Sequence, residues 1–200
     1  MTPLIVIPAA GASSRMQGRD KLLETVDGKP LLRRQAEAAL STGAPVLICL
    51  PSVEGPRADA LEGLDLDLVP VPDAAEGMGA TLRTAALRAA KSSQRPMAIL
   101  LPDVPGIGAS EIQAVFARFD AAGGNTPVRA TDQTGRPGTP LVVPPRLIEA
   151  FTRLTGDDGG KGALKGETIL TVPLPGDRAT RDLDTPEEWE QWRCDTGTPG

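Results

Sequence analysis

The chain has 200 residues, a net charge of −5, no histidine and two cysteines. A chain of this length buries about 70% of its unfolded surface around one core, and its acidic balance argues against broad electrostatic binding to nucleic acid or anionic lipid. The missing histidine excludes Ser-His-Asp and Cys-His triads and the commonest zinc sites. No signal-peptide pattern occurs, and no apolar run approaches the roughly 20 residues that span a bilayer. We therefore expect a cytoplasmic protein that binds neither nucleic acid nor membrane.

Short apolar runs bounded by Pro and Gly alternate with segments of helical spacing along the chain. The predicted strands are residues 4–7, 45–50, 66–71, 97–101, 128–130, 141–143 and 168–172. The predicted helices are residues 31–40, 80–90, 110–119, 146–154 and 185–192. This alternation predicts an α/β fold of three layers, in which helices cover both faces of a mainly parallel, twisted sheet. We predict a single domain over residues 1–195 and a flexible tail at 196–200.

Two helix starts carry capping-box patterns. Ser110 is followed by Gln113, and Thr185 is followed by Glu188 with Pro186 at the first helical position. Cys49 lies in an apolar run, where we interpret it as a small buried hydrophobic residue rather than a reactive thiol.

Ligands of open α/β sheets bind beyond the carboxyl ends of the strands, so the segments after the strands are the candidates for chemistry. The first predicted strand leads into a run of small residues followed by spaced cations, from Pro8 to Lys21. Small side chains let backbone N–H groups approach an anion, and Arg15 and Lys21 can neutralise phosphate oxygens. Neither the Walker pattern nor G-x-G-x-x-G is present, which disfavours a P-loop NTPase and a dinucleotide-binding dehydrogenase.

The loop sequence A-A-G-x-S-x-R-M followed by a lysine resembles the signature of the MobA-like NTP transferases, which include the molybdenum-cofactor guanylyl- and cytidylyltransferases. The resemblance implies a nucleotide-diphospho-sugar transferase-like, Rossmann-like fold. In that family the loop holds the triphosphate, which implies a catalytic role for Arg15 and Lys21. The nucleotide-binding residues implied for this loop are Ala9, Ala10, Gly11, Ser13, Arg15 and Lys21.

A second cluster, Glu76–Leu82, opens a predicted helix, where free N–H groups suit the polar edges of a nucleotide. It resembles the G-M-G-x-S-L segment of the cytidylyltransferases, which lines the base and ribose pocket. The resemblance implies nucleotide-binding roles for Gly77, Met78, Gly79 and Thr81. The alternative is a glycine-rich helix start without a ligand.

Two acidic segments are candidate metal sites. Asp103 directly follows a hydrophobic strand, where a carboxylate is costly unless it is exposed, paired or bound to a cation. It matches the magnesium aspartate of the family's D-x-P motif, and the alternative is a turn residue. The segment Arg181–Trp189 resembles the family's D-I-D-T-P-E-D segment, which supplies a second carboxylate. Spacing does not separate Asp182 from Asp184; we choose Asp182, because Asp184 can serve the start of the following helix.

Residues 135–140 and 155–161 resemble the acceptor-side segments of the cytidylyltransferases. The first of these commonly contains a histidine where Thr139 stands here, which leaves the acceptor open.

Taken together, the resemblance implies a Mg²⁺-dependent cytidylyltransferase that moves CMP from CTP onto the terminal phosphate of molybdopterin, with a molybdoenzyme as a further partner. A phosphate acceptor is largely dianionic at neutral pH and needs no general base, which agrees with the missing histidine. Three alternatives stay open: GTP in place of CTP, a sugar phosphate as acceptor, and a non-catalytic molybdopterin-binding chaperone. Asp20 stands where the isoprenoid-pathway enzymes usually have Pro, which disfavours methylerythritol phosphate.

Overall fold

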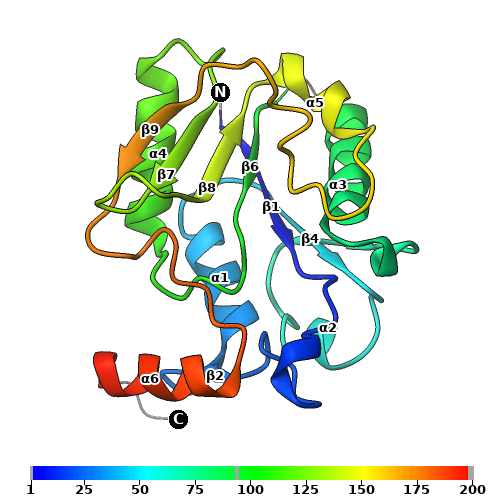
Figure 1. Ribbon diagram of the computed structural model, residues 1–200. Coiled ribbons are helices and arrows are strands. Elements are labelled where there is room, and N and C mark those ends of the chain that lie inside the picture. The colour runs from blue at the N-terminus through cyan, green and yellow to red at the C-terminus, as the bar shows by residue number, and fades with distance from the viewer. Residues whose placement is uncertain (1, 93–94, 198–200) are drawn as a thin grey trace.

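The computed structural model describes residues 2–92 and 95–197. A seven-stranded sheet with the order β5-β4-β1-β6-β8-β7-β9 runs through its centre (Figure 1). The strands are β1 (Leu4–Pro8), β4 (Val46–Leu50), β5 (Asp67–Pro70), β6 (Met97–Ile99), β7 (Val128–Thr131), β8 (Pro137–Val143) and β9 (Leu170–Pro173). Neighbouring strands are parallel except at β8, which is antiparallel to both β6 and β7. The predicted α/β fold with a mainly parallel sheet is confirmed.

Helices cover both faces of this sheet. They are α1 (Leu31–Leu40), α2 (Pro56–Asp59), α3 (Met78–Ser92), α4 (Ala109–Ala121), α5 (Pro145–Phe151) and α6 (Pro186–Thr196). α3 and α5 pack together on one face, and α1 and α4 cover the other (Figure 1). Ile5 and Ile7 belong to one buried cluster and Val6 to the other, because successive side chains of a strand point to opposite faces. The sheet thus separates two cores, which makes the three layers.

A third buried cluster ties the C-terminal helix to the loop after β1. Trp189 and Trp192 of α6 pack with Met16 of that loop, with Leu31 of α1 and with Leu183. The two indole rings meet edge to face at 6.1 Å between centroids. In Figure 1, α6 lies beside the two-stranded ribbon of β2 (Thr25–Val26) and β3 (Lys29–Pro30). The last helix of the chain is thereby held next to its first loop.

One predicted helix start is confirmed and one is wrong. At α6 the Glu188 N–H donates to Thr185 Oγ1 at 3.2 Å, and the Thr185 N–H donates to the Glu188 carboxylate at 3.0 Å. α4 does not begin with Ser110 as its cap: Gly108 holds that position, and its N–H donates to Glu111 Oε2 at 3.0 Å. The Ser110 hydroxyl donates to the same carboxylate. Glu111 at the third helical position therefore takes the capping role that was expected of Gln113.

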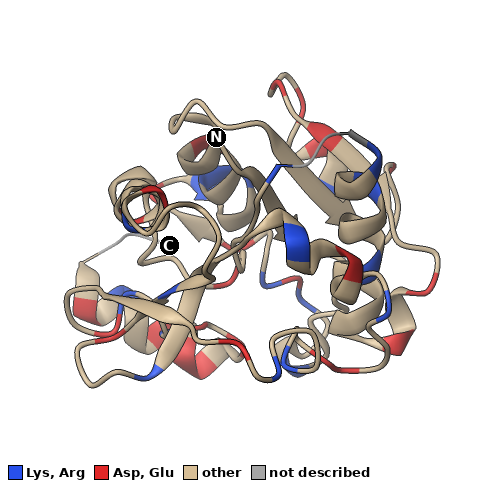
Figure 2. Cartoon of the chain, turned by 90° about the horizontal axis from the view of Figure 1, so that it is seen from above, with Lys and Arg blue, Asp and Glu red and all other residues tan. Residues whose placement is uncertain are grey.

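Cys49 is fully buried in β4, as predicted, and burial raises the pKa of its thiol to about 12. No helix within residues 2–92 and 95–197 is long and apolar enough to cross a membrane. α6 extends to Thr196, one residue into the predicted tail, and residues 198–200 of that tail lie outside the described residues. Lys and Arg residues are interspersed with Asp and Glu over the face seen in Figure 2.

Candidate active site

The loop after β1 has a backbone that its own sequence does not favour. Ser13, Gln17 and Gly18 take positive φ angles of 51°, 53° and 88° around the short 3₁₀ helix Ser14–Met16. Positive φ is uncommon for residues other than glycine, and it persists where the surroundings fix the backbone. Met16, fully buried against α6, is one such anchor.

Lys21 at the end of this loop lies between two carboxylates from distant parts of the chain. Its Nζ is 2.5 Å from Asp103 Oδ2 and 2.6 Å from Asp184 Oδ1. Burial by itself would lower the pKa of Lys21, but the charges and hydrogen bonds of Asp103 and Asp184 outweigh it and raise the pKa above its ordinary value. Arg15 reaches the same cluster, with Nη2 2.6 Å from Asp184 Oδ2. The structure therefore brings the predicted phosphate-binding cations and the predicted metal aspartate Asp103 together.

A backbone hydrogen bond sets the position of the second acidic segment. The N–H of Leu183, a fully buried residue, donates to the carbonyl of Asp103 at 3.0 Å. Asp182 and Asp184 lie on either side of this anchor, so both are held near Asp103. Asp184 is 9% exposed, whereas Asp182 is more exposed and only partly buried. Partial burial raises the pKa of Asp182, and the nearby carboxylates of Asp184 and Asp103 add to the rise.

Asp184 does not serve the start of α6, which was the reason for choosing Asp182 as the metal ligand. Thr185 and Glu188 cap the helix, and only the backbone N–H of Asp184 takes part, donating to Glu188 Oε2 at 2.7 Å. The Asp184 carboxylate is occupied by Lys21 and Arg15 instead. Of the two aspartates, Asp182 is the one whose carboxylate makes no ion pair within residues 2–92 and 95–197.

Asp103 has one oxygen without a partner. Its Oδ1 is buried and accepts no hydrogen bond, although Oδ2 pairs with Lys21. A buried, unsatisfied carboxylate oxygen is costly unless a ligand completes it. Over the described part of the chain, no group of three or more His, Cys, Asp or Glu residues is arranged to hold a metal ion by itself. Mg²⁺ characteristically takes one or two carboxylates and completes its shell with phosphates and water, so this donor set suits that metal.

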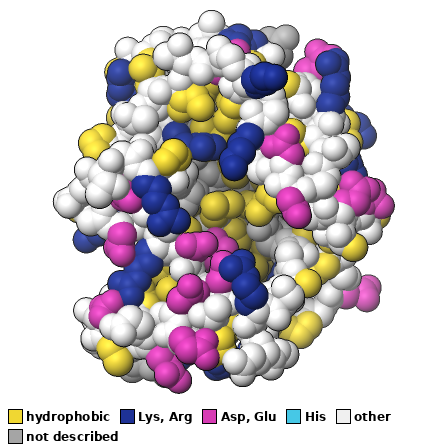
Figure 3. Space-filling view, viewed as in Figure 1, with side chains coloured by type: hydrophobic (Ala, Val, Ile, Leu, Met, Phe, Trp, Pro, Cys, Tyr) yellow, Lys and Arg dark blue, Asp and Glu magenta, His cyan; other side chains and the backbone are white. Residues whose placement is uncertain are grey.

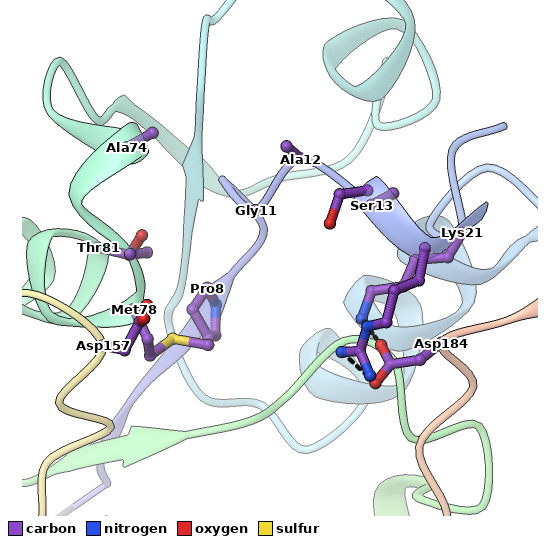
Figure 4. A pocket seen from close by; sticks show the side chains of 13 residues that line it. Pro8, Gly11, Ala12, Ser13, Lys21, Ala74, Met78, Thr81, Asp157 and Asp184 are labelled. Carbon is purple, nitrogen blue, oxygen red and sulfur yellow. Dashed lines mark hydrogen bonds and ion pairs between the residues drawn. The ribbon is translucent and has the colours of Figure 1, made fainter. Parts of the chain in front are cut away.

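A pocket of about 350 Å³ opens beside this cluster. In Figure 4 Lys21 and Asp184 form one side, while Met78, Thr81 and Asp157 face them across the cavity. Figure 3 shows this face of the molecule hollowed at its centre, with hydrophobic side chains in the hollow and charged ones around it. The predicted nucleotide-binding residues that line the pocket are Gly11, Ser13, Arg15, Lys21, Gly77, Met78 and Thr81.

Three predicted nucleotide-binding residues do not line this pocket. Ala9 is buried, and its N–H and carbonyl are bonded to the Cys49 carbonyl and to the Arg57 guanidinium. Ala10 lines a neighbouring, mostly apolar pocket of about 490 Å³, which shares Gly11, Ala12 and Ala74 with the first. Gly79 is buried and is not among the residues that line the pocket.

The glycines at 77 and 79 have a structural cause that sequence reasoning missed. A Cβ at Gly79 would lie 2.7 Å from the carbonyl oxygens of Thr155 and Gly156, and the Gly79 N–H donates to Gly156. A Cβ at Gly77, whose φ is 111°, would lie 2.0 Å from Asp157 Oδ1. The two glycines therefore let the loop after α5 approach the start of α3. This approach brings Asp157 into the pocket, and its only sequence signal was its place in the predicted acceptor-side segment 155–161.

Thr139, which stands where the family commonly has histidine, makes hydrogen bonds that stabilise the sheet. It is 2% exposed, its Oγ1 accepts the Leu101 N–H at 3.0 Å, and the same hydroxyl donates to the Ile99 carbonyl at 3.2 Å. The hydroxyl therefore joins β8 to Ile99 at the end of β6 and to Leu101, which lies two residues before Asp103. Its neighbour Gly138 is equally confined, because a Cβ there would lie 2.0 Å from the Ala179 carbonyl oxygen.

Comparison with known protein families gives the family of the chain. A family model described as the MobA-like NTP transferase domain matches residues 5–172. The chain belongs to this family. It is accordingly a member of a nucleotidyltransferase family whose substrates are nucleoside triphosphates. The matched residues include the loop after β1, the segment around Gly77 and Asp103, and end before Asp182. Among curated proteins, none matches the sequence significantly.

Solved structures share the fold over nearly the whole chain. The Mycobacterium tuberculosis H37Rv protein Rv0371c superposes with a TM-score of 0.77 at 21% identity, over 96% of this chain and 98% of its own. A homologue of that protein from Mycobacterium sp. strain JC1 gives a TM-score of 0.79 at 25% identity, over 97% and 96% of the two chains. Rv0371c has also been crystallised with manganese, and that structure aligns at 20% identity over 96% of this chain and 97% of its own, with a TM-score of 0.74. CMP:2-keto-3-deoxy-manno-octonic acid synthetase in complex with CTP superposes at 0.75 with 14% identity, over 98% and 99%.

Proposed function

We propose that this chain, acting as a single nucleotidyltransferase domain, moves CMP from CTP onto the terminal phosphate of molybdopterin and releases pyrophosphate. The observation that carries this proposal is the convergence of Arg15 and Lys21 on an acidic cluster beside the pocket. Cations at the end of a small-residue loop suit a triphosphate. Carboxylates next to these cations suit the metal ion that accompanies a triphosphate.

The reaction forms a bond between an oxygen of the acceptor phosphate and the α-phosphorus of CTP. The bond from that phosphorus to the bridging oxygen of the β-phosphate breaks, and pyrophosphate leaves with the electron pair. A phosphate monoester has its second pKa near 6, so it attacks as a dianion and no residue is required to take a proton. Catalysis then consists of aligning two anions and offsetting the charge that develops. Arg15 and Lys21 do this at the pocket wall.

We propose Mg²⁺ as the cofactor, held by Asp103 and Asp182. The unpartnered, buried Oδ1 of Asp103 supports the first assignment, and the proximity of Asp182, with no ion pair of its own, supports the second. The bound metal would polarise the α-phosphate and offset the charge of the leaving pyrophosphate. The complex of the Mycobacterium tuberculosis Rv0371c protein with manganese supports a divalent cation as the cofactor.

The preference for CTP rests on Ala10 in the loop Ala9-Ala10-Gly11, where the guanylyltransferases of the family usually have Gly at the middle position. Ala10 is 5% exposed and lines the pocket that adjoins the first one across Gly11. A base that extends past Gly11 would meet the methyl group of Ala10, which leaves less space for a purine than a glycine would leave. One methyl group is worth only about 1–3 kcal/mol of discrimination, so the preference is finite. The CTP complex of the structural neighbour adds support.

The test is pyrophosphate release from each of the four nucleoside triphosphates with molybdopterin, a panel of sugar phosphates, or no acceptor. We expect release with CTP and molybdopterin, and in competition with GTP we expect Ala10→Gly to gain activity with GTP. A wild-type preference for GTP would overturn the cytidylyl assignment alone. Release only with a sugar phosphate would replace the acceptor, and binding of molybdopterin without any release would favour the chaperone.

A further inference from the structure

A buried guanidinium from outside the phosphate loop bonds to both ends of that loop. Arg57 belongs to α2, the short helix after β4, and its side chain is 10% exposed. Its Nη1 donates to the carbonyl of Ala9, where the loop begins, at 2.6 Å. Its Nε and Nη2 donate to the two carboxylate oxygens of Asp20, where the loop ends, at 2.6 and 2.9 Å. This two-point contact is the planar fork geometry that only arginine can offer.

The centre of the loop is joined to the same pair. Arg57 Nη2 also donates to Ser13 Oγ at 3.2 Å, and the Ser13 hydroxyl donates to Asp20 Oδ1 at 3.2 Å. Asp20 Oδ1 accepts the Leu22 N–H as well, at 3.0 Å. Ser13 is one of the residues with positive φ, so the pair fixes the loop at a point where the backbone would otherwise relax. Lys21 lies in the chain between Asp20 and Leu22, which the hydrogen bond from the Leu22 N–H to Asp20 joins.

Arg57 does not line the 350 Å³ pocket, although Arg57 and Asp20 both line the adjoining pocket of about 490 Å³. Its N–H groups are directed at Ala9, Ser13 and Asp20, and the Asp20 carboxylate balances its charge. Its contribution to a triphosphate is therefore indirect. Arg57 fixes the positions of Ser13 and Lys21 before a ligand binds.

We infer that Arg57 and Asp20 are positioning residues of the active site, which preorganise the phosphate loop for the triphosphate. The loop has small residues at one end and positive φ angles in its middle, so its order depends on contacts such as those of Met16 with α6 and of Asp20 with Arg57. A misplacement of about 1 Å at a catalytic group can cost on the order of a hundredfold in rate. The effect on the nucleotide rests on the proposed function; the effect on loop order does not.

The experiment compares wild type with Arg57→Lys and Asp20→Asn, and uses Arg33→Lys as a matched control. Arg33 bonds to the carbonyls of Ala60 and Glu62 just after α2 and does not touch the loop. Hydrogen exchange of residues 9–22 is measured without ligand, followed by the dissociation constant of CTP with Mg²⁺ and by kcat and KM. Thermal unfolding midpoints report on the fold as a whole.

For Arg57→Lys and Asp20→Asn we expect faster exchange confined to residues 9–22 and CTP binding weakened about tenfold or more, as expected when a bidentate contact is lost. The control Arg33→Lys should leave the exchange of residues 9–22 and the CTP affinity unchanged. Wild-type loop exchange and CTP affinity in Arg57→Lys would overturn the inference, and so would an equal loss in Arg33→Lys. If wild type binds no nucleotide while loop exchange still responds to Arg57→Lys, the proposed function fails and the positioning of the loop stands.

Discussion

Lys21 and Asp184 lie 163 residues apart in the chain and are joined by a 2.6 Å contact between Nζ and Oδ1. This ion pair connects the first loop of the fold to the segment before its last helix. It exists because Trp189 and Trp192 hold α6 against Met16 and because the Leu183 N–H bonds to Asp103. Lys21, predicted to hold phosphate, and Asp103, predicted to hold metal, thus form one cluster with Asp184, which was not chosen as a metal ligand.

The two loop cations should differ in their effects on stability. The Arg15 side chain is 67% exposed, and exposed ion pairs contribute little to folding, so Arg15→Ala should leave the unfolding free energy nearly unchanged. Lys21 is 17% exposed and separates two carboxylates, so Lys21→Ala should destabilise the protein measurably at neutral pH. Each change should cost on the order of 2–4 kcal/mol of transition-state stabilisation. Urea unfolding and steady-state kinetics measure both effects; unchanged kinetics in both variants would contradict the phosphate-binding role.

Asparagine substitutions separate the three carboxylates. Asp103→Asn and Asp182→Asn should raise the Mg²⁺ concentration needed for half-maximal activity, because each removes a charge that we propose to hold the metal. Asp184→Asn should instead weaken nucleotide binding at saturating Mg²⁺, because Lys21 and Arg15 lose the charged partner that holds them in position. Activity is titrated with Mg²⁺ at fixed nucleotide. If Asp184→Asn changes the Mg²⁺ requirement and Asp182→Asn does not, then Asp184 is the metal ligand in place of Asp182.

Thr139 should act through the strand that precedes Asp103. Thr139→Val keeps the shape but removes the hydroxyl that serves the Leu101 N–H and the Ile99 carbonyl, which should destabilise the fold by about 1–3 kcal/mol. Thr139→Ser keeps the hydroxyl and should retain most of the stability. Unfolding in urea gives the two free energies, and KM for the acceptor should stay the same in Thr139→Ser. Equal stability of the valine variant and wild type would show that these hydrogen bonds are dispensable.

Stability should fall on the acid side through Asp20. Burial alone would raise the pKa of Asp20, but the hydrogen bond and charge of Arg57, with the Leu22 N–H and the Ser13 hydroxyl, lower it below its ordinary value. In the unfolded chain Asp20 has the ordinary pKa of an aspartate, about 3.9, so it binds its proton at a higher pH there, and the stabilisation is complete above that pH. It is lost as the pH falls through the lower, folded-state pKa. Unfolding free energies of wild type and Asp20→Asn at pH 7, 5, 4 and 3 should therefore converge in acid; a constant difference would contradict this.

Local patterns in the sequence determined the elements and the kinds of chemistry. Apolar runs bounded by Pro and Gly predicted the strands, because burial on both faces of a sheet requires such runs. The Thr185 and Glu188 cap followed from contacts within one helical turn. The small residues after β1 and the aspartate after β6 indicated phosphate and metal because ligands gather at these strand ends. All of these inferences depend on neighbours close in the chain.

Only the tertiary structure decided which distant groups those residues meet. Sequence spacing left Asp182 and Asp184 equivalent, yet the bond from Leu183 to Asp103 and the approach of Lys21 gave them different environments. Arg57 carried no recognisable signal, because its partners Ala9 and Asp20 are defined by how α2 packs beside the loop. The glycines of the α3 start suggested a ligand, but packing against residues 155–157 also requires them. A side chain's partner across the fold depends on the packing of whole elements, which no short window of sequence contains.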